Sequence, residues 1–157
     1  MMIVPEDGMT ITRDTVLQPG VYFLPNGIEI ASDGVTLDGN GALLIGADFQ
    51  GRGVAVRQCS GVTIKRLNIE RYYHGIAATA CANLRVEDCA VTRTHELAAP
   101  GVFLDVWLDR SEAYGGAIFL NGVIDSVIAN NDLRHQQSGL LLYGCNRIDV
   151  ARNNTSH

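Results

Sequence analysis

Proline is scarce in this chain, and long apolar runs are missing. The 157 residues include 4 prolines against 17 glycines, which fits a fold in which tight bends recur while the strands between them keep their amide donors. No run approaches the roughly 18 consecutive apolar residues that a membrane-spanning helix needs. The sequence therefore predicts no transmembrane segment.

An excess of positive charge is also missing. The chain has 12 Lys and Arg against 17 Asp and Glu, a formal net charge of −5. A negative average field does not attract nucleic acid or an anionic membrane, so we expect neither as the main partner. A local basic patch remains compatible with this balance.

The first residues, MMIVPEDGMT, lack the basic segment followed by an apolar segment that marks a secretory signal. Two interpretations of the cellular location stay open. The chain is either a cytoplasmic protein or the mature form of an exported one, and composition does not separate them.

The four cysteines lack the Cys-x-x-Cys spacing typical of zinc sites. Cys59, Cys81 and Cys145 each follow an inward apolar position by three residues, and Cys89 belongs to a second series of this kind. A disulfide, a metal site and a nucleophile are the functional alternatives. Side chains stacked in register point the same way rather than toward one another. We therefore expect buried free thiols, and no motif predicts a cofactor.

The sequence does contain short apolar bursts that alternate with polar residues and recur. In residues 53–74, GVAVRQCSGVTIKRLNIERYYH, three bursts alternate at period two, which predicts three strands. The pattern returns with a spacing near 22 residues. In successive copies its central inward position falls at Leu37, Ile64, Val86, Ile128 and Val150. This period predicts an all-β solenoid in which each coil buries its face against the next.

The repeat organises residues 1–157 as a single domain, with residues 1–26 expected to cap the first coil. Between Val86 and Ile128 the interval is 42 residues rather than 22, so the excess must loop out as an insertion within residues 92–115. The insertion holds Trp107, the only tryptophan. A long excursion from a regular solenoid is a common place for binding groups. The alternative is a flap that covers the coil surface.

The repeats stop near Thr155, where a β-solenoid would present an open hydrogen-bonding edge and an apolar floor. We expect either that the chain is the N-terminal part of a longer protein or that another chain covers this end through end-to-end self-association.

A family resemblance is carried by the stretches GIEIASDGVTLDGNGALLIG, SGVTIKRLNI, NLRVEDCAV and SVIANNDL. They resemble the right-handed parallel β-helix proteins of the pectin-lyase-like group, and within it the β-helix repeat proteins that include NosD-like periplasmic components. The resemblance implies a right-handed, single-stranded parallel β-helix of about five coils with an N-terminal cap and one long loop insertion.

Such families include polysaccharide lyases, glycoside hydrolases, C5-epimerases and phage tailspikes, and the fold alone does not choose among them. We expect a carbohydrate-active protein that acts on a polysaccharide as a lyase, hydrolase or epimerase. The alternative is a non-catalytic carbohydrate-binding or structural module. Whether the chain is an enzyme stays open, and a polysaccharide or other glycan is the expected partner.

In proteins of these families, catalytic residues usually project outward from the first sheet. Here that row would consist of Ala55, Arg57, Ala77, Thr79, Phe119, Asn121, Leu141 and Tyr143. The row lacks the carboxylate cluster that lyases use for calcium and that hydrolases use for catalysis. Arg57, Asn121 and Tyr143 remain as candidate substrate-binding residues.

A second cluster is expected at the bends that join successive coils. Its candidate catalytic residues are Tyr73, His74, His95 and His135, with Trp107 and Tyr114 of the insertion as candidate substrate-binding residues. Imidazoles beside tyrosines and Glu96 could abstract and return a proton at a sugar carbon. The aromatic rings could equally stack on sugar rings without chemistry, or could simply be tolerated at exposed bends. The histidines come from separate loops without a ligand-spacing motif, so no metal site is predicted.

Overall fold

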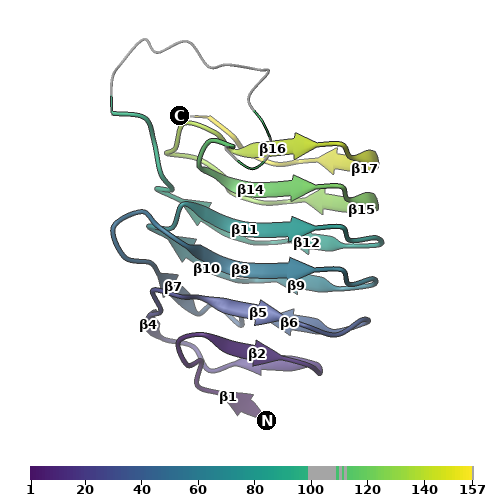
Figure 1. The fold of residues 1–157 in the computed structure, drawn as a ribbon. Coiled ribbons are helices and arrows are strands. Elements are labelled where there is room, and N and C mark those ends of the chain that lie inside the picture. Colours follow the sequence, from purple (N-terminus) through teal and green to yellow (C-terminus); the bar gives the residue numbers. More distant parts are fainter. Residues whose placement is uncertain (99–108, 110, 112, 157) are drawn as a thin grey trace.

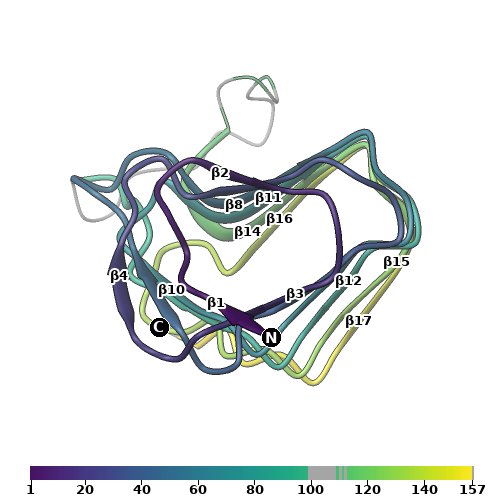
Figure 2. The ribbon, with the colours of Figure 1, turned by 90° about the horizontal axis from the view of Figure 1, so that it is seen from below.

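The chain winds into a parallel β-helix whose coils stack in register (Figure 1). The computed structural model describes residues 1–98, 109, 111 and 113–156. Each full coil contributes one strand to each of two long sheets, and the earlier coils also contribute to a third, shorter sheet (Figure 2). All paired strands run parallel, as expected when each strand follows the previous one after a complete turn.

The first sheet contains six strands, which are β2 (Met9–Ile11), β5 (Ile28–Ile30), β8 (Arg52–Arg57), β11 (His74–Thr79), β14 (Gly116–Asn121) and β16 (Leu140–Tyr143). The second sheet contains seven, which are β1 (Met2–Ile3), β3 (Thr15–Leu17), β6 (Thr36–Asp38), β9 (Thr63–Lys65), β12 (Arg85–Glu87), β15 (Ile124–Ala129) and β17 (Asn146–Ala151). The third contains four, which are β4 (Val21–Phe23), β7 (Leu43–Ile45), β10 (Asn68–Glu70) and β13 (Ala90–Thr92).

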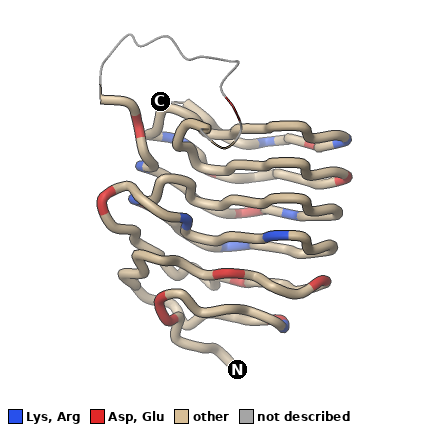
Figure 3. The backbone as a smooth tube through the Cα atoms, viewed as in Figure 1, with Lys and Arg blue, Asp and Glu red and all other residues tan. Residues whose placement is uncertain are grey.

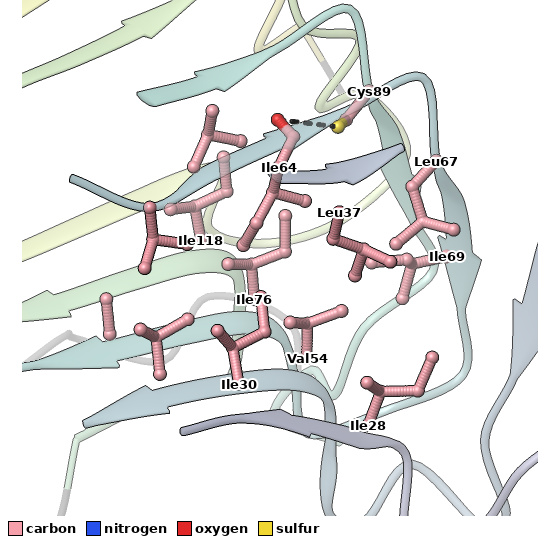
Figure 4. Close-up of a cluster of buried hydrophobic side chains, with 14 of the residues drawn as sticks. Ile28, Ile30, Leu37, Val54, Ile64, Leu67, Ile69, Ile76, Cys89 and Ile118 are labelled. Atoms are coloured by element: carbon pink, nitrogen blue, oxygen red, sulfur yellow. Dashed lines mark hydrogen bonds between the residues drawn. The ribbon is translucent and has the colours of Figure 1, made fainter. Parts of the chain in front are cut away.

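The predicted interior column is confirmed by the register of the second sheet. Its five members pair one after another in the order Leu37, Ile64, Val86, Ile128 and Val150. Because side chains alternate across a strand, every second residue points inward and stacks on its counterpart in the next coil. Figure 4 shows the resulting ladder of isoleucine, leucine and valine side chains.

The coil number differs from the prediction, because six strands in the first sheet correspond to about six coils rather than five. Part of the segment expected to be a cap supplies the additional coil, since β2, β3 and β4 pair in parallel with β5, β6 and β7. Pro19 lies in the bend between β3 and β4, so its missing amide donor interrupts no ladder. In the sequence, Pro19 and Gly20 interrupt two short β-prone runs, which is why this segment was expected to be a cap.

The cysteines occupy inward corners, as predicted. Cys59, Cys81 and Cys89 are buried and Cys145 is partly exposed, and all four are free thiols. Beside them, Asn131 stabilises a corner with its amide group. Its side-chain oxygen accepts a hydrogen bond from the Cys89 backbone amide at 2.9 Å, and its nitrogen donates to the Val86 carbonyl at 3.1 Å.

The insertion leaves the solenoid between β13 and β14, where the interruption of the repeat predicted it. Its two ends meet at one bend. The His95 amide donates to the Tyr72 carbonyl at 3.0 Å, and the Gly116 amide donates to the Tyr73 carbonyl at 3.1 Å. A side chain at Gly115 would place its Cβ 2.6 Å from the His95 carbonyl oxygen, so glycine permits this close approach. Trp107 lies outside the described residues.

Candidate functional site

Two adjoining cavities lie at the corner where the third sheet turns into the first. The arginine pocket has a volume of about 570 Å³, and its lining includes Glu29, Gln50, Arg52, Arg57, Tyr73 and His74. The histidine pocket has a volume of about 530 Å³ and is lined by Asp48, Phe49, Gln50, Arg93, Thr94, His95, Glu96 and His135. Gln50 lines both, so the cavities share a wall.

The arginine pocket carries two cations on one strand. Arg52 and Arg57 are the end residues of β8, and Glu29 lies on β5 opposite Ala55. Figure 3 shows the two positive segments on β8 and the negative segment on the neighbouring β5. Within the described part of the chain, neither arginine forms a salt bridge with a carboxylate. Unpaired guanidinium groups beside an open cavity suit an anionic ligand.

The surroundings of Arg52 change the pKa of its guanidinium group. Partial burial, followed by the nearby charge of Arg57, lowers the pKa of the Arg52 guanidinium below its usual value. Arginine starts from a pKa above about 12, so it stays charged at neutral pH.

His74 lies in the wall of the arginine pocket and is almost fully buried. Its Nε2 lies 2.8 Å from the Tyr114 carbonyl oxygen, so Nε2 carries the proton and donates it. Its ring stacks on Phe119 with centroids 4.6 Å apart. Burial lowers the pKa of His74 to about 4, so the imidazole is neutral near pH 7 and a weak base.

Tyr73 also forms a hydrogen bond to the returning end of the insertion. Its hydroxyl donates to the Ala113 carbonyl at 2.8 Å, and burial raises the pKa of the phenol. Its ring lies 4.8 Å from His74 and 4.7 Å from His95 between centroids. The hydrogen bonds from Tyr73 and His74 therefore hold the returning end of the insertion against the first sheet.

The structure separates the three predicted histidines into two places. His95 and His135 line the histidine pocket together with Glu96, whereas His74 lines the arginine pocket. His135 follows Arg93 in the corner stack, because the Arg93 amide donates to the His135 carbonyl at 3.3 Å. His135 is therefore equivalent in register to Arg93 rather than to His74.

The outward row of the first sheet has the predicted register. Arg57, Thr79, Asn121 and Tyr143 pair in sequence across four strands. Tyr143 makes an edge contact with Phe119 at a centroid distance of 5.7 Å. Tyr114, whose carbonyl accepts the His74 bond, lies at the return of the insertion. Ala55 and Arg57 are the members of the predicted row that line the arginine pocket.

Several pocket residues were missed from the sequence, namely Glu29, Asp48, Phe49, Gln50, Arg52 and Arg93. One signal could have found part of them. The interval from Leu37 to Ile64 is 27 residues rather than 22, which indicates extra residues in that coil. Some of these extra residues form the loop between β7 and β8, which supplies Asp48, Phe49 and Gln50.

The described part of the chain has neither a metal-binding cluster nor a membrane-spanning helix. No three histidine, cysteine or carboxylate side chains there are grouped so that they could hold a metal ion. Among the same residues, no helix has the length and apolar character needed to cross a membrane.

The fold and this corner define a parallel β-helix protein with an open surface groove. A family model for the right-handed β-helix region matches residues 20–157, and the chain belongs to this right-handed β-helix family. The resemblance inferred from the repeats is thereby confirmed. No curated protein sequence matches the chain.

A solved structure shares the fold. A protein from Parabacteroides merdae, provisionally assigned as a glycosyl hydrolase, superimposes with a TM-score of 0.71 over 95% of this chain and 77% of that chain, at 9% sequence identity. At this identity the likeness shows the fold alone.

Proposed function

We propose that the protein binds an anionic polysaccharide, with the arginine pocket as the subsite for a charged sugar. The observation that carries this proposal is the pair Arg52 and Arg57, which line an open cavity without a carboxylate partner among the described residues. A guanidinium group can hold a sugar carboxylate or sulfate through two parallel hydrogen bonds. Glu29 and Gln50 can accept hydrogen bonds from sugar hydroxyls.

A carbohydrate fits this groove better than a small apolar ligand. The cavity is shallow and lined by charged, amide and aromatic groups, and apolar ligands prefer enclosed apolar cavities. Tyr73 contributes an aromatic ring that can cover one face of a sugar. The glycosyl hydrolase assignment of the Parabacteroides merdae protein, which shares the fold, is consistent with a saccharide ligand.

Binding is favoured over proton transfer at His74 and Tyr73. Nε2 of His74 and the hydroxyl of Tyr73 are engaged by backbone carbonyls, and the low pKa of His74 makes it a weak base. An efficient acid or base needs a pKa near the working pH and access to the substrate. Recognition without chemistry is therefore the primary proposal.

A second candidate, polysaccharide cleavage or epimerisation, is favoured by one observation. His95, His135 and Glu96 line the same cavity, which places two imidazoles and a carboxylate around one space. These are the residue types that general acid–base catalysis uses. Under this candidate the catalytic groups would be His95 and His135, with Glu96 beside them.

The binding proposal is tested by calorimetric titration of the protein with oligogalacturonate as an acidic probe and maltohexaose as a neutral one. We expect oligogalacturonate to bind and its affinity to fall with added salt, because charged contacts are screened. Arg52→Gln and Arg57→Gln should each weaken binding at least about tenfold, since a charge-assisted contact contributes about 1.5–3 kcal/mol and about 1.4 kcal/mol is a factor of ten.

Arg85→Gln is the matched control, because Arg85 lies on the second sheet and outside both cavities. It makes the same change in net charge and should leave binding unchanged. Equal weakening by all three substitutions would show that only the net charge matters, and the arginine pocket would then not be the site.

The second candidate needs a separate assay. Acidic and neutral polysaccharides are incubated with the protein, and unsaturated products and new reducing ends are followed over time. Turnover that His95→Ala or His135→Ala abolishes, and that His74→Gln does not, would support catalysis in the histidine pocket. Products that form equally with all variants would place the chemistry elsewhere.

A further inference from the structure

We propose that the histidine pocket is a second subsite of the same groove and takes an uncharged sugar ring stacked on Phe49. The ligand would then be a polysaccharide in which a charged sugar is followed by an uncharged one. This second subsite rests on the proposed function, because the arginine pocket positions the charged sugar. Phe49, the shared wall of the two cavities and the difference in their charges carry the proposal.

Phe49 occupies a backbone position that does not suit it. The Gln50 amide donates to the Ala47 carbonyl at 3.0 Å, and the two central residues of this turn, Asp48 and Phe49, have φ values of 53° and 56°. Turns with two central residues at positive φ favour glycine, asparagine and aspartate. A bulky side chain in this left-handed region costs roughly 1–2 kcal/mol.

The side chain of Phe49 adds a second cost. It is 42% exposed, so much of its apolar surface faces water rather than the core. Glycine at this position would remove both the backbone strain and the exposed apolar area. The covered part of the side chain can contribute packing, and the exposed part of the ring in the wall of the cavity provides a flat apolar face for a sugar.

The two cavities lie next to each other. Gln50 lines both of them, and the ring of Tyr73 in the arginine pocket lies 4.7 Å from the ring of His95 in the histidine pocket. One layer of side chains therefore separates the two spaces. Adjacent sugars of a single chain can occupy both, with the shared Gln50 amide between them.

The charges of the two cavities differ in sign. In the arginine pocket, two arginines outnumber Glu29. In the histidine pocket, Asp48 and Glu96 outnumber Arg93, whose guanidinium lies 3.2 Å from the Glu70 carboxylate. The negative charge of Asp48 would repel a sugar carboxylate, whereas a hydroxyl of an uncharged sugar can donate a hydrogen bond to Asp48.

The test compares three probes by calorimetric titration, namely oligogalacturonate, hyaluronan oligosaccharides and maltohexaose. Oligogalacturonate is acidic throughout, hyaluronan alternates an acidic with an uncharged sugar, and maltohexaose is neutral. We expect hyaluronan oligosaccharides to bind most tightly to the wild-type protein. Phe49→Ala should weaken this binding about tenfold while changing the binding of oligogalacturonate less than about twofold.

Two further variants keep the result interpretable. Phe23→Ala removes an aromatic side chain that is 65% exposed on β4 and outside both cavities, and it should leave all affinities unchanged. Phe49→Gly should weaken hyaluronan binding as much as Phe49→Ala does. It should unfold at the same or a higher temperature than the wild type, because glycine accepts positive φ without strain.

The outcomes separate the two proposals. If Arg52→Gln weakens binding of both acidic probes and Phe49→Ala weakens neither, the second subsite is overturned and the arginine pocket stands. Tighter binding of oligogalacturonate than of hyaluronan by the wild type would also overturn the second subsite. If the wild type binds none of the three probes, the proposed function fails and the second subsite fails with it.

Discussion

Acidification should destabilise the protein through His74 before its carboxylates are affected. The pKa of His74 is lowered from about 6.5 in the unfolded chain to about 4 in the folded one, first by burial and then by the nearby charges of Arg52 and His95. The folded state therefore binds fewer protons than the unfolded state between these two values. Stability is complete above about pH 6.5 and is lost as the pH falls toward 4.

The size of the effect follows from the two pKa values. Proton linkage to a single group with a pKa of about 4 when folded and about 6.5 when unfolded lowers the free energy of unfolding by roughly 1 kcal/mol near pH 5.5 and roughly 3 kcal/mol near pH 4.5. The carboxylates act in a different window. A hydrogen bond from Arg66 lowers the pKa of Asp38. The contribution of Asp38 to stability is therefore lost only as the pH falls below the usual aspartate pKa near 4.

The measurement is a series of urea denaturation curves between pH 7.5 and pH 4.5. His74→Gln is the matched variant, because its amide nitrogen can still donate to the Tyr114 carbonyl but does not titrate. We expect the wild type to lose stability across this range more steeply than the variant. The difference between their free energies of unfolding should reproduce the values given above.

Parallel pH profiles for the two proteins would refute this reasoning. They would show that the imidazole is hydrated well enough to accept a proton in the folded state, or that the chain at the Tyr114 end of the insertion opens at little cost. In either case the hydrogen bond from Nε2 would not be a permanent feature of the corner, and His74 would regain the accessibility that a catalytic base needs.

Three further predictions concern the scaffold. Tyr72→Phe should lower the free energy of unfolding by about 1–2 kcal/mol in urea denaturation, because the buried hydroxyl donates to the Leu24 carbonyl at 2.7 Å; an unchanged value would mean that water replaces the bond. Asn131→Leu should lower the free energy of unfolding by about 1–3 kcal/mol and speed hydrogen exchange at the Cys89 amide, because the Asn131 side-chain oxygen accepts a hydrogen bond from that amide at 2.9 Å. A thiol reagent followed by mass spectrometry should modify Cys145 first, because the other cysteines are buried, and modification at equal rates in the native protein would contradict the corner stack.

The interior of the fold could be predicted because the apolar–polar alternation that produces it is local and recurs in each coil. Leu37, Ile64 and Val86 each stand in a short strand with the same alternation, and stacking them requires only that the period be kept. The first coil was expected to be a cap because Pro19 and Gly20 interrupt its β-prone runs. Its alternation is confirmed only by pairing with the next coil.

The candidate site was predicted less completely because bends do not follow the strand period. The sequence shows that Tyr73, His74 and His135 all lie at one kind of bend, but it does not show which residues share a register. Arg71, Arg93 and His135 all have positive φ and stack on one another, so His135 lies three positions before the equivalent of His74. Within a corner, three positions are enough to change the direction of a side chain completely.

The position of the two cavities follows from the constraints on the other corners. Between the first and second sheets, Cys59, Cys81 and Cys145 each bond to a backbone carbonyl of the preceding coil, which favours a constant corner. Between the second and third sheets, Asn131 makes similar bonds, and the connection from β6 to β7 is only two residues longer than the one from β9 to β10. Between the third and first sheets, the chain accepts both the loop that carries Phe49 and the whole insertion. Neither Phe49 nor Arg52 contributes to the interior. Substitutions in this corner can therefore change its surface chemistry while the ladder of buried side chains, and with it the stability of the β-helix, stays the same.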